Sequence, residues 1–197
     1  AALAAAGAGD FQIHAAFAHV AWEGTPDEAR ESVAVMARGL ASPSTLDHRV
    51  QVGLRRVAAS AEVETPLGTL RATSLHLDHM SAPARLAQAR EAGAVALSAA
   101  YARAPPPVIA GDLNAPRGSD AHGAFGALAH LDASDAAGGG RIDHVFVHRS
   151  APLRGVEARR LFDDAATRVS DHPGVLVRLE AAPAGVVSWT RVIAPHA

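Results

Sequence analysis

The chain has 197 residues and a mass of 20.2 kDa, enough for one domain with a two-layer core. Its net charge is −2 and all 18 basic residues are arginines, so it lacks the basic excess of proteins that bind duplex nucleic acid tightly. It has no cysteine, which excludes disulfides and thiolate metal sites, and no run of 18 apolar residues that would predict a transmembrane segment. Localisation stays open between cytoplasmic and secreted.

The first forty residues carry only a weak pattern. Residues 1–9 are rich in alanine and glycine but have no basic segment and no initiator methionine, so they do not read as an intact signal peptide. The chain is therefore expected to begin inside a longer one. Residues 11–20 are apolar and residues 23–32 are polar. The apolar run 33–36 predicts a strand, although four residues do not exclude the end of a helix.

A hairpin and a helix follow. Residues 54–64 and 69–77 predict two strands, and residues 65–68 supply a proline and a glycine for the turn between them. Ser81 then predicts a helix start with Pro83 in its first turn, and three prolines at 105–107 end the helix. Helical spacing places Leu86 and Gly93 on one face and Gln88 elsewhere.

The second half alternates strands with polar loops. It predicts a short buried strand at 108–111, a helix near 121–131, a flexible glycine break at 138–140, and strands at 141–147, 156–162 and 174–179. Residues 1–180 are expected to form the domain, and 181–197 a C-terminal appendage with a possible strand at 186–192. Hairpins mixed with helices favour an α/β class, a layered sandwich of mixed sheets, over a strict βαβ alternation.

Four polar clusters lie near the ends of these strands. They contain, in chain order, Ser74, His76 and Asp78; Asp112 and Asn114; Asp143; and Ser170, Asp171 and His172. Side chains alternate along a strand, so Ser74, His76 and Asp78 are expected on one face. Each cluster has an alternative interpretation as a surface histidine, turn chemistry or a capped loop, because Asp and Asn often satisfy nearby backbone groups.

Taken together and in this order, the four clusters carry more information. The motifs His76-Leu77-Asp78-His79, Gly111-Asp112-Leu113-Asn114, Arg141-Ile142-Asp143-His144 and Ser170-Asp171-His172-Pro173 resemble the successive motifs of the endonuclease/exonuclease/phosphatase superfamily. That superfamily includes deoxyribonuclease I-like enzymes, abasic-site endonucleases, neutral sphingomyelinases and inositol polyphosphate 5-phosphatases. The resemblance is clearest over residues 54–179 and implies the deoxyribonuclease I-like α/β sandwich.

The resemblance also implies a role for each motif residue. Asp112 would orient or deprotonate the attacking water, and Asn114 would hold the phosphate or that water. His172 would contact the phosphate, and Asp143 would fix its tautomer and favour its charged form. His76 would be a second phosphate donor. Asp171, with Asp112, would bind Mg²⁺ or Mn²⁺, since hard oxygen ligands prevail and thiols are absent.

The N-terminal part departs from the family pattern. Relatives have a first strand ending in Asn and a metal-binding Glu in a Gln-Glu pair, but here Gln12 is followed by Ile13, and Glu23 lies in an apparent loop. The domain is therefore expected to be N-terminally incomplete. The remaining histidines, His122 and His130 among them, offer no convincing ligand set, and these two are interpreted as surface residues.

The leading functional hypothesis is a metal-dependent hydrolase of phosphodiesters or phosphomonoesters. The alternative is a catalytically inactive domain of the same fold that serves as a binding module. A Ser/His/Asp hydrolase is set aside because the Gly-x-Ser-x-Gly elbow is absent. A small phosphodiester or phospholipid-like substrate is expected, nucleic acid being disfavoured by the net charge. Oligomeric state is not readable.

Overall fold

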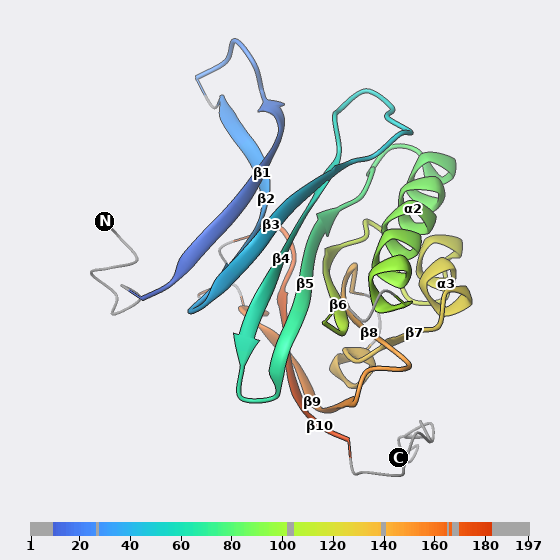
Figure 1. Cartoon of the computed structure of the whole chain (residues 1–197). Coiled ribbons are helices and arrows are strands. Elements are labelled where there is room, and N and C mark those ends of the chain that lie inside the picture. The colour runs from blue at the N-terminus through green and yellow to red at the C-terminus, as the bar shows by residue number, and fades with distance from the viewer. Residues whose placement is uncertain are drawn as a thin grey trace.

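The structure, a computed structural model, describes residues 10–26, 28–101, 105–138, 141–164, 166 and 170–182. Figure 1 shows its elements, which are, in chain order, β1 (Gln12–Ala21), β2 (Ala29–Ala37), β3 (Leu40–Asp47), β4 (Val57–Thr65), β5 (Gly68–His76), α2 (Ala82–Tyr101), β6 (Pro107–Asp112), α3 (Asp120–Ala127), β7 (His130–Asp132), a 3₁₀ turn η1 (Asp135–Ala137), β8 (Asp143–His148), β9 (Leu153–Leu161) and β10 (Gly174–Ala181).

A six-stranded mixed sheet forms the centre, in the order β3-β4-β5-β6-β8-β7. Only β5 and β6 run parallel, and the other neighbours pair antiparallel. Helices α2 and α3 cover one face of this sheet, and the separate hairpin β1–β2 lies on the other side of it (Figure 1). Strands β9 and β10 form a second two-stranded sheet. The predicted layered α/β sandwich of mixed sheets is confirmed.

Alternation along β4 shows how the layers are held together. Ala58 packs with Leu75, Ile109 and Phe125 beneath the helices, whereas its neighbours Val57 and Ala59 pack with residues of the β1–β2 hairpin. A third cluster joins β8 and β9 with Leu70. The two main clusters are rich in alanine, which is abundant throughout the sequence, so the layers approach closely with few large side chains.

Most elements of the middle of the chain agree with the sequence prediction. The predicted hairpin is β4–β5, and the predicted helix is α2, where the Ala84 amide donates to the Ser81 hydroxyl at 3.2 Å. Strand β2 extends beyond the predicted 33–36 on both sides because it pairs with β1 from Ala29 to Ala37, with Val33, Val35 and Ala37 buried at alternate positions.

Three predictions are corrected. The helix expected near 121–131 ends at Ala127, Ala129 takes a left-handed φ of 61°, and residues 130–132 pair with β8 instead. Gln88 is fully buried, because its amide bridges the Asp78 amide and the Val50 carbonyl. Asp78 is buried beyond the end of β5, where it accepts from the amides of residues 80 and 81 rather than sharing a strand face with His76.

Besides β7, two strands were not predicted, and one predicted strand lies outside the described residues. Strands β1 and β3 fall in segments whose alternation is weak in the sequence. The possible strand at 186–192, with most of the predicted appendage, lies outside the described residues. Within the described part of the chain, no helix is long and apolar enough to cross a membrane.

Candidate active site

Three neighbouring strands of the central sheet bring the expected residues to one edge. His76 ends β5 and pairs with Asp112, which ends β6, and Asp112 pairs in turn with Asp143, which begins β8. Because β5 and β6 are parallel and β8 is antiparallel to them, two carboxyl ends meet one amino end. The strand arrangement itself therefore gathers three residues that are far apart in the sequence.

The backbone around Asp112 is tightly constrained. Gly111 has a φ of 144°, and a Cβ there would come within 1.9 Å of the Leu75 carbonyl oxygen, so only glycine fits. Asn114 has a left-handed φ of 50°. Its amide donates to Asp112 Oδ1 at 2.6 Å, and its Nδ2 donates to the Leu77 carbonyl at 2.9 Å. These contacts leave Asp112 Oδ2 facing the site.

His172 lies between two carboxylates. Its Nδ1 is 2.6 Å from Asp143 Oδ2 and its Nε2 is 3.3 Å from Asp112 Oδ2. Partial burial by itself would lower the pKa of His172, but the negative charges of Asp143 and Asp112 outweigh it and raise the pKa above its usual value. Burial, together with the nearby Asp112, raises the pKa of Asp143 despite its contact with His172. The arrangement favours a charged imidazole with its Nε2 directed at Asp112.

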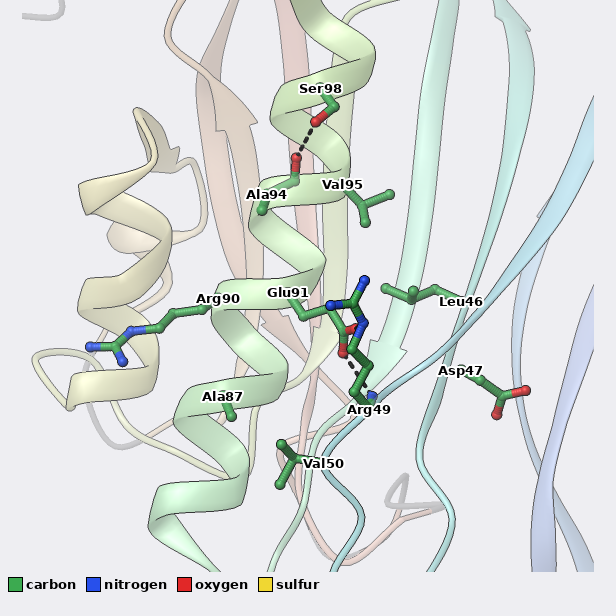
Figure 2. Close-up of a pocket in the computed structure, with 10 residues that line it drawn as sticks. All are labelled: Leu46, Asp47, Arg49, Val50, Ala87, Arg90, Glu91, Ala94, Val95 and Ser98. Carbon is green, nitrogen blue, oxygen red and sulfur yellow. Dashed lines mark hydrogen bonds and ion pairs between the residues drawn. The ribbon is translucent and has the colours of Figure 1, made fainter.

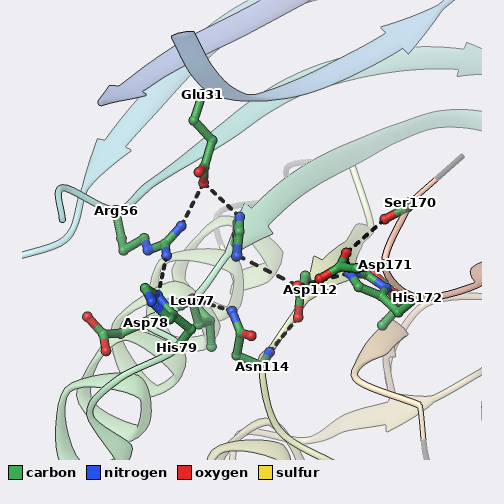
Figure 3. A network of polar contacts seen from close by, with 12 residues as sticks. Glu31, Arg56, Leu77, Asp78, His79, Asp112, Asn114, Ser170, Asp171 and His172 are labelled. Atoms are coloured by element: carbon green, nitrogen blue, oxygen red, sulfur yellow. Dashed lines mark hydrogen bonds and ion pairs between the residues drawn. The ribbon is translucent and has the colours of Figure 1, made fainter. Parts of the chain in front are cut away.

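His76 mirrors this arrangement on the other side of Asp112. Its Nε2 is 3.6 Å from Asp112 Oδ2 and its Nδ1 is 2.9 Å from Glu31 Oε1. Glu31 also pairs with the buried Arg56 at 2.7 Å, as Figure 3 shows. Burial and the charge of Arg56 lower the pKa of His76. The site thus holds two histidine–carboxylate pairs with Asp112 between them, and their pKa shifts are opposite.

Glu31 is the residue that the sequence prediction missed. It lies on β2 at the alternate position before Val33 and Val35, and hence on the inward face of the hairpin. A glutamate in phase with a buried strand face is the signal that could have found it. The predicted strand began at residue 33, however, and placed Glu31 in a polar stretch.

Asp171 lies at the outer rim of the site. Its side chain is 94% exposed, and Oδ1 is 3.7 Å from His172 Nε2. The Ser170 hydroxyl donates to the same oxygen at 3.1 Å, and this hydrogen bond lowers the pKa of Asp171 (Figure 3). All six predicted site residues (His76, Asp112, Asn114, Asp143, Asp171 and His172) therefore gather around one edge of the sheet.

The carboxylates fit the expected metal by their chemistry. Mg²⁺ usually keeps several waters and binds through one or two carboxylates plus substrate phosphates. Asp112 and Asp171 offer such oxygens, at 3.3 Å and 3.7 Å from His172 Nε2. Glu31 is less available to a metal ion, because its Oε1 contacts Arg56 and His76 and its Oε2 contacts His19.

A second polar cluster is formed by residues of α3, β7 and β8, and it corrects the prediction for His122. Asp132 Oδ2 is 3.1 Å from His122 Nε2, 3.1 Å from His144 Nδ1 and 2.7 Å from Arg141 Nη2. The two imidazoles and the carboxylate could hold a metal ion, although the Arg141 guanidinium competes for the same oxygen. His130, also expected at the surface, is buried, and its Nε2 contacts the Gly93 carbonyl. None of the six predicted site residues belongs to this cluster.

Two hollows differ in their relation to the site. The larger, of about 530 Å³, lies between α2 and the segment after β3, and Figure 2 shows Arg49 and Glu91 paired in its wall. It contains none of the predicted site residues. The smaller, of about 160 Å³, is lined by Asp143, His172, Phe162, Ser170 and Gly174. The smaller hollow therefore adjoins the candidate chemistry.

Solved structures share this fold at low sequence identity. The human Nocturnin catalytic domain, solved with a bound sulfate anion, superposes with a TM-score of 0.72 at 13% identity, covering 91% of this chain and 75% of its own. A Bacteroides thetaiotaomicron mannosyl-6-phosphatase superposes with a TM-score of 0.66 at 16% identity, and the match covers 87% of this chain and 77% of that protein. D. rerio TDP2 complexed with a single strand DNA product has a TM-score of 0.61 at 15% identity, and the match covers 88% of this chain and 78% of that protein.

The family assignment rests on the sequence as well as on the fold. No curated protein matches the chain. Residues 8–172 match the Endonuclease/Exonuclease/phosphatase family, a span that includes each of the six predicted site residues. The deoxyribonuclease I-like expectation from the four motifs is confirmed by this match and by the shared fold. The chain belongs to the Endonuclease/Exonuclease/phosphatase family.

Proposed function

We propose that this protein hydrolyses phosphate esters in a divalent-metal-dependent reaction, by attack of an activated water on phosphorus. The observation that carries the proposal is the position of Asp112 Oδ2 between His76 Nε2 and His172 Nε2. A carboxylate flanked by two imidazoles offers a base for water and two donors for phosphoryl oxygens within one small volume. Family membership supports a phosphoesterase in general.

Each residue has a defined task in this proposal. Asp112 orients the water and accepts its proton, and Asn114 keeps Asp112 in place through its backbone amide while a second N–H of its side chain remains for the phosphate. His172, kept charged by Asp143, donates to a phosphoryl oxygen as negative charge develops. His76, oriented by Glu31, is the second donor. Asp112 and Asp171 would hold Mg²⁺ or Mn²⁺, which supplies polarisation of the phosphoryl oxygen and eases departure of the leaving alkoxide.

The alternative, a catalytically inactive domain that binds phosphate-bearing partners, is favoured by one observation. Both Glu31 oxygens are engaged by cationic or imidazole groups, and Asp143 Oδ2 is paired with His172 Nδ1. Among the described residues around His172, this leaves Asp112 and the exposed Asp171 as the proposed metal-binding carboxylates. An incomplete ligand set would bind metal weakly. The phosphate donors would nevertheless remain.

One experiment separates the two functions. The purified chain, freed of metal by chelator, is assayed with Mg²⁺ and Mn²⁺ on a phosphomonoester and a phosphodiester, p-nitrophenyl phosphate and bis-p-nitrophenyl phosphate. The enzyme hypothesis expects chelator-sensitive turnover that Asp112→Ala and His172→Ala each lower by at least about 10²-fold. Asp10→Ala, at an exposed aspartate, should leave it unchanged.

Binding decides the outcome if turnover is absent. Inorganic phosphate that shifts the His172 imidazole signals in NMR, without turnover by the chain, would identify the binding module. Turnover that survives both site substitutions would contradict the assigned residues. Neither turnover nor phosphate binding would contradict both functions.

A further inference from the structure

The small hollow next to His172 has the size of one ring. Its volume is about 160 Å³, and an apolar cavity of about 150 Å³ is known to hold benzene. His172 separates this hollow from the centre of the site, because Nε2 faces Asp112 while Nδ1 faces Asp143, which lines the hollow. A molecule bound at Nε2 through its phosphate can therefore extend past the imidazole into the hollow.

Phe162 forms an apolar wall of this hollow at an energetic cost. It follows the last residue of β9 and has a φ of 58°, in the left-handed region that bulky side chains rarely adopt. Its side chain is also 51% exposed. Strain and an exposed aromatic side chain both disfavour the free protein, and such features persist mainly where they serve a binding site. The Phe162 ring is the only apolar side chain among the described residues that line the hollow, and it offers a flat surface to a ligand.

The polar side of the hollow excludes the phosphate itself. The Asp143 carboxylate lines it, and a second anion there would be repelled. Asp143 and Ser170 are, however, good partners for neutral hydroxyl groups: the carboxylate accepts, and the Ser170 oxygen that donates to Asp171 retains acceptor capacity. A hollow lined by an aromatic side chain and by hydroxyl acceptors matches a ring that has an apolar face and a polar edge.

From these features we propose that the hollow formed by Phe162, Asp143, Ser170, His172 and Gly174 is a subsite for a hydroxylated ring, such as that of a sugar or cyclitol, in the alcohol part of the substrate. The ring packs on Phe162 and its hydroxyls donate to Asp143. The inference rests on the proposed function, since it places the phosphate at His172. It narrows the substrate from phosphate esters in general to small esters with a ring near the phosphate.

The test compares two phosphomonoesters that differ in the ring. Glucose 6-phosphate has a hydroxylated ring and glycerol 3-phosphate has none. The wild-type protein should prefer the ring ester by about tenfold or more, in kcat/KM or, without turnover, in Kd measured by NMR titration. Phe162→Ala should remove most of that preference, mainly through KM or Kd. The kcat/KM or Kd for glycerol 3-phosphate should change by less than about twofold. Phe162→Tyr, which retains an aromatic ring, should keep the preference for the ring ester, whereas Phe162→Leu should lose it.

Controls separate this inference from the proposed function. Ile13→Ala removes an apolar side chain of similar exposure on β1 and should leave both esters unaffected. Thermal unfolding shows whether each variant folds. If phosphate binds at His172 but Phe162→Ala changes both esters equally, or neither, the subsite is wrong and the proposed function stands. If neither ester nor inorganic phosphate binds at all, the subsite and the proposed function are both wrong.

Discussion

At the scale of single residues, the two site histidines should titrate on opposite sides of the usual value. The pKa of His172 is raised by Asp143 and Asp112, whereas that of His76 is lowered by burial and Arg56. A raised folded-state pKa means that the contribution of His172 to stability is complete below its unfolded pKa and is lost as pH rises through the folded one. The same step removes the charged donor, so activity should fall on the alkaline side.

Two-dimensional NMR of the imidazole protons across a pH series checks this. We expect His172 to titrate above about 6.5 and His76 below it. Asp143→Asn should lower the His172 pKa, because the first of the raising charges is removed. Asp10→Asn serves as the matched control for a carboxylate lost at the surface. A His172 that titrates below His76 would contradict the arrangement.

The site residues that the sequence proposed, and that the structure brings together, share one property. All four lie at or next to the end of a short strand, so the local pattern places them: Asp112 ends β6, Asn114 follows it, Asp143 begins β8 and His172 precedes β10. Glu31 is defined instead by contacts with distant segments, and the partners of Asp132 by the packing of neighbouring elements against one another. His122 meets Asp132 only because α3 folds back over β7 and β8, and no spacing in the sequence encodes that approach.

At the scale of elements, the junction of β5 and β6 depends on a missing side chain. A Cβ on Gly111 would lie 1.9 Å from the Leu75 carbonyl oxygen, which is a backbone atom of the paired strand, so the clash cannot be relieved by turning a flexible side chain. Gly111→Ala should therefore destabilise the protein by about 3 kcal/mol or more and displace Asp112. Urea denaturation measures the free energy of unfolding.

Gly118→Ala is the matched control for this substitution. Gly118 also has a positive φ, 84°, but a Cβ there meets nothing within 4 Å. Its cost should be limited to backbone strain, about 1 kcal/mol. Equal losses for the two variants would show that the approach of β6 to Leu75 does not constrain the site.

Prediction of elements failed where neighbours override local preference. Residues 130–132 continue an apolar, helix-compatible stretch, yet they form β7 because the edge of β8 provides hydrogen-bond partners. Strand β3 is mostly exposed and contains Pro43, so its sequence lacks the alternation that marks a half-buried strand. Both strands lie at the edges of the central sheet, where pairing decides the conformation.

At the scale of the whole molecule, class and layering follow from the sequence because hairpins and helices are mixed along it. The separation of the strands into one six-stranded and two two-stranded sheets does not follow from the sequence, because it depends on which sheet faces are covered. Buried alanines let β1–β2 approach β4, and alanine has no strong preference for one partner. Composition therefore predicts a tight core without predicting which layers meet.

The same close packing buries several histidines, and acid should consequently destabilise the whole fold. His130 is only 2% exposed, and burial lowers its pKa to about 4. Burial also lowers the pKa of His48 and His148. A depressed histidine pKa means that the unfolded chain binds the proton first, so the free energy of unfolding falls as pH drops from about 6.5 towards 4. For His130 alone the loss approaches about 3 kcal/mol at the acid end.

Urea denaturation at a series of pH values tests this against His130→Gln, which retains a polar group near the Gly93 carbonyl. The variant should be less stable than wild type at pH 7.5, because packing against Phe125 is lost, but the difference should shrink or reverse by pH 4.5. Carboxylates that titrate in the same range affect both proteins alike and cancel in the difference. A difference that stays constant with pH would mean that His130 accepts its proton in the folded state as readily as in the unfolded one, and its burial would then contribute nothing to acid sensitivity.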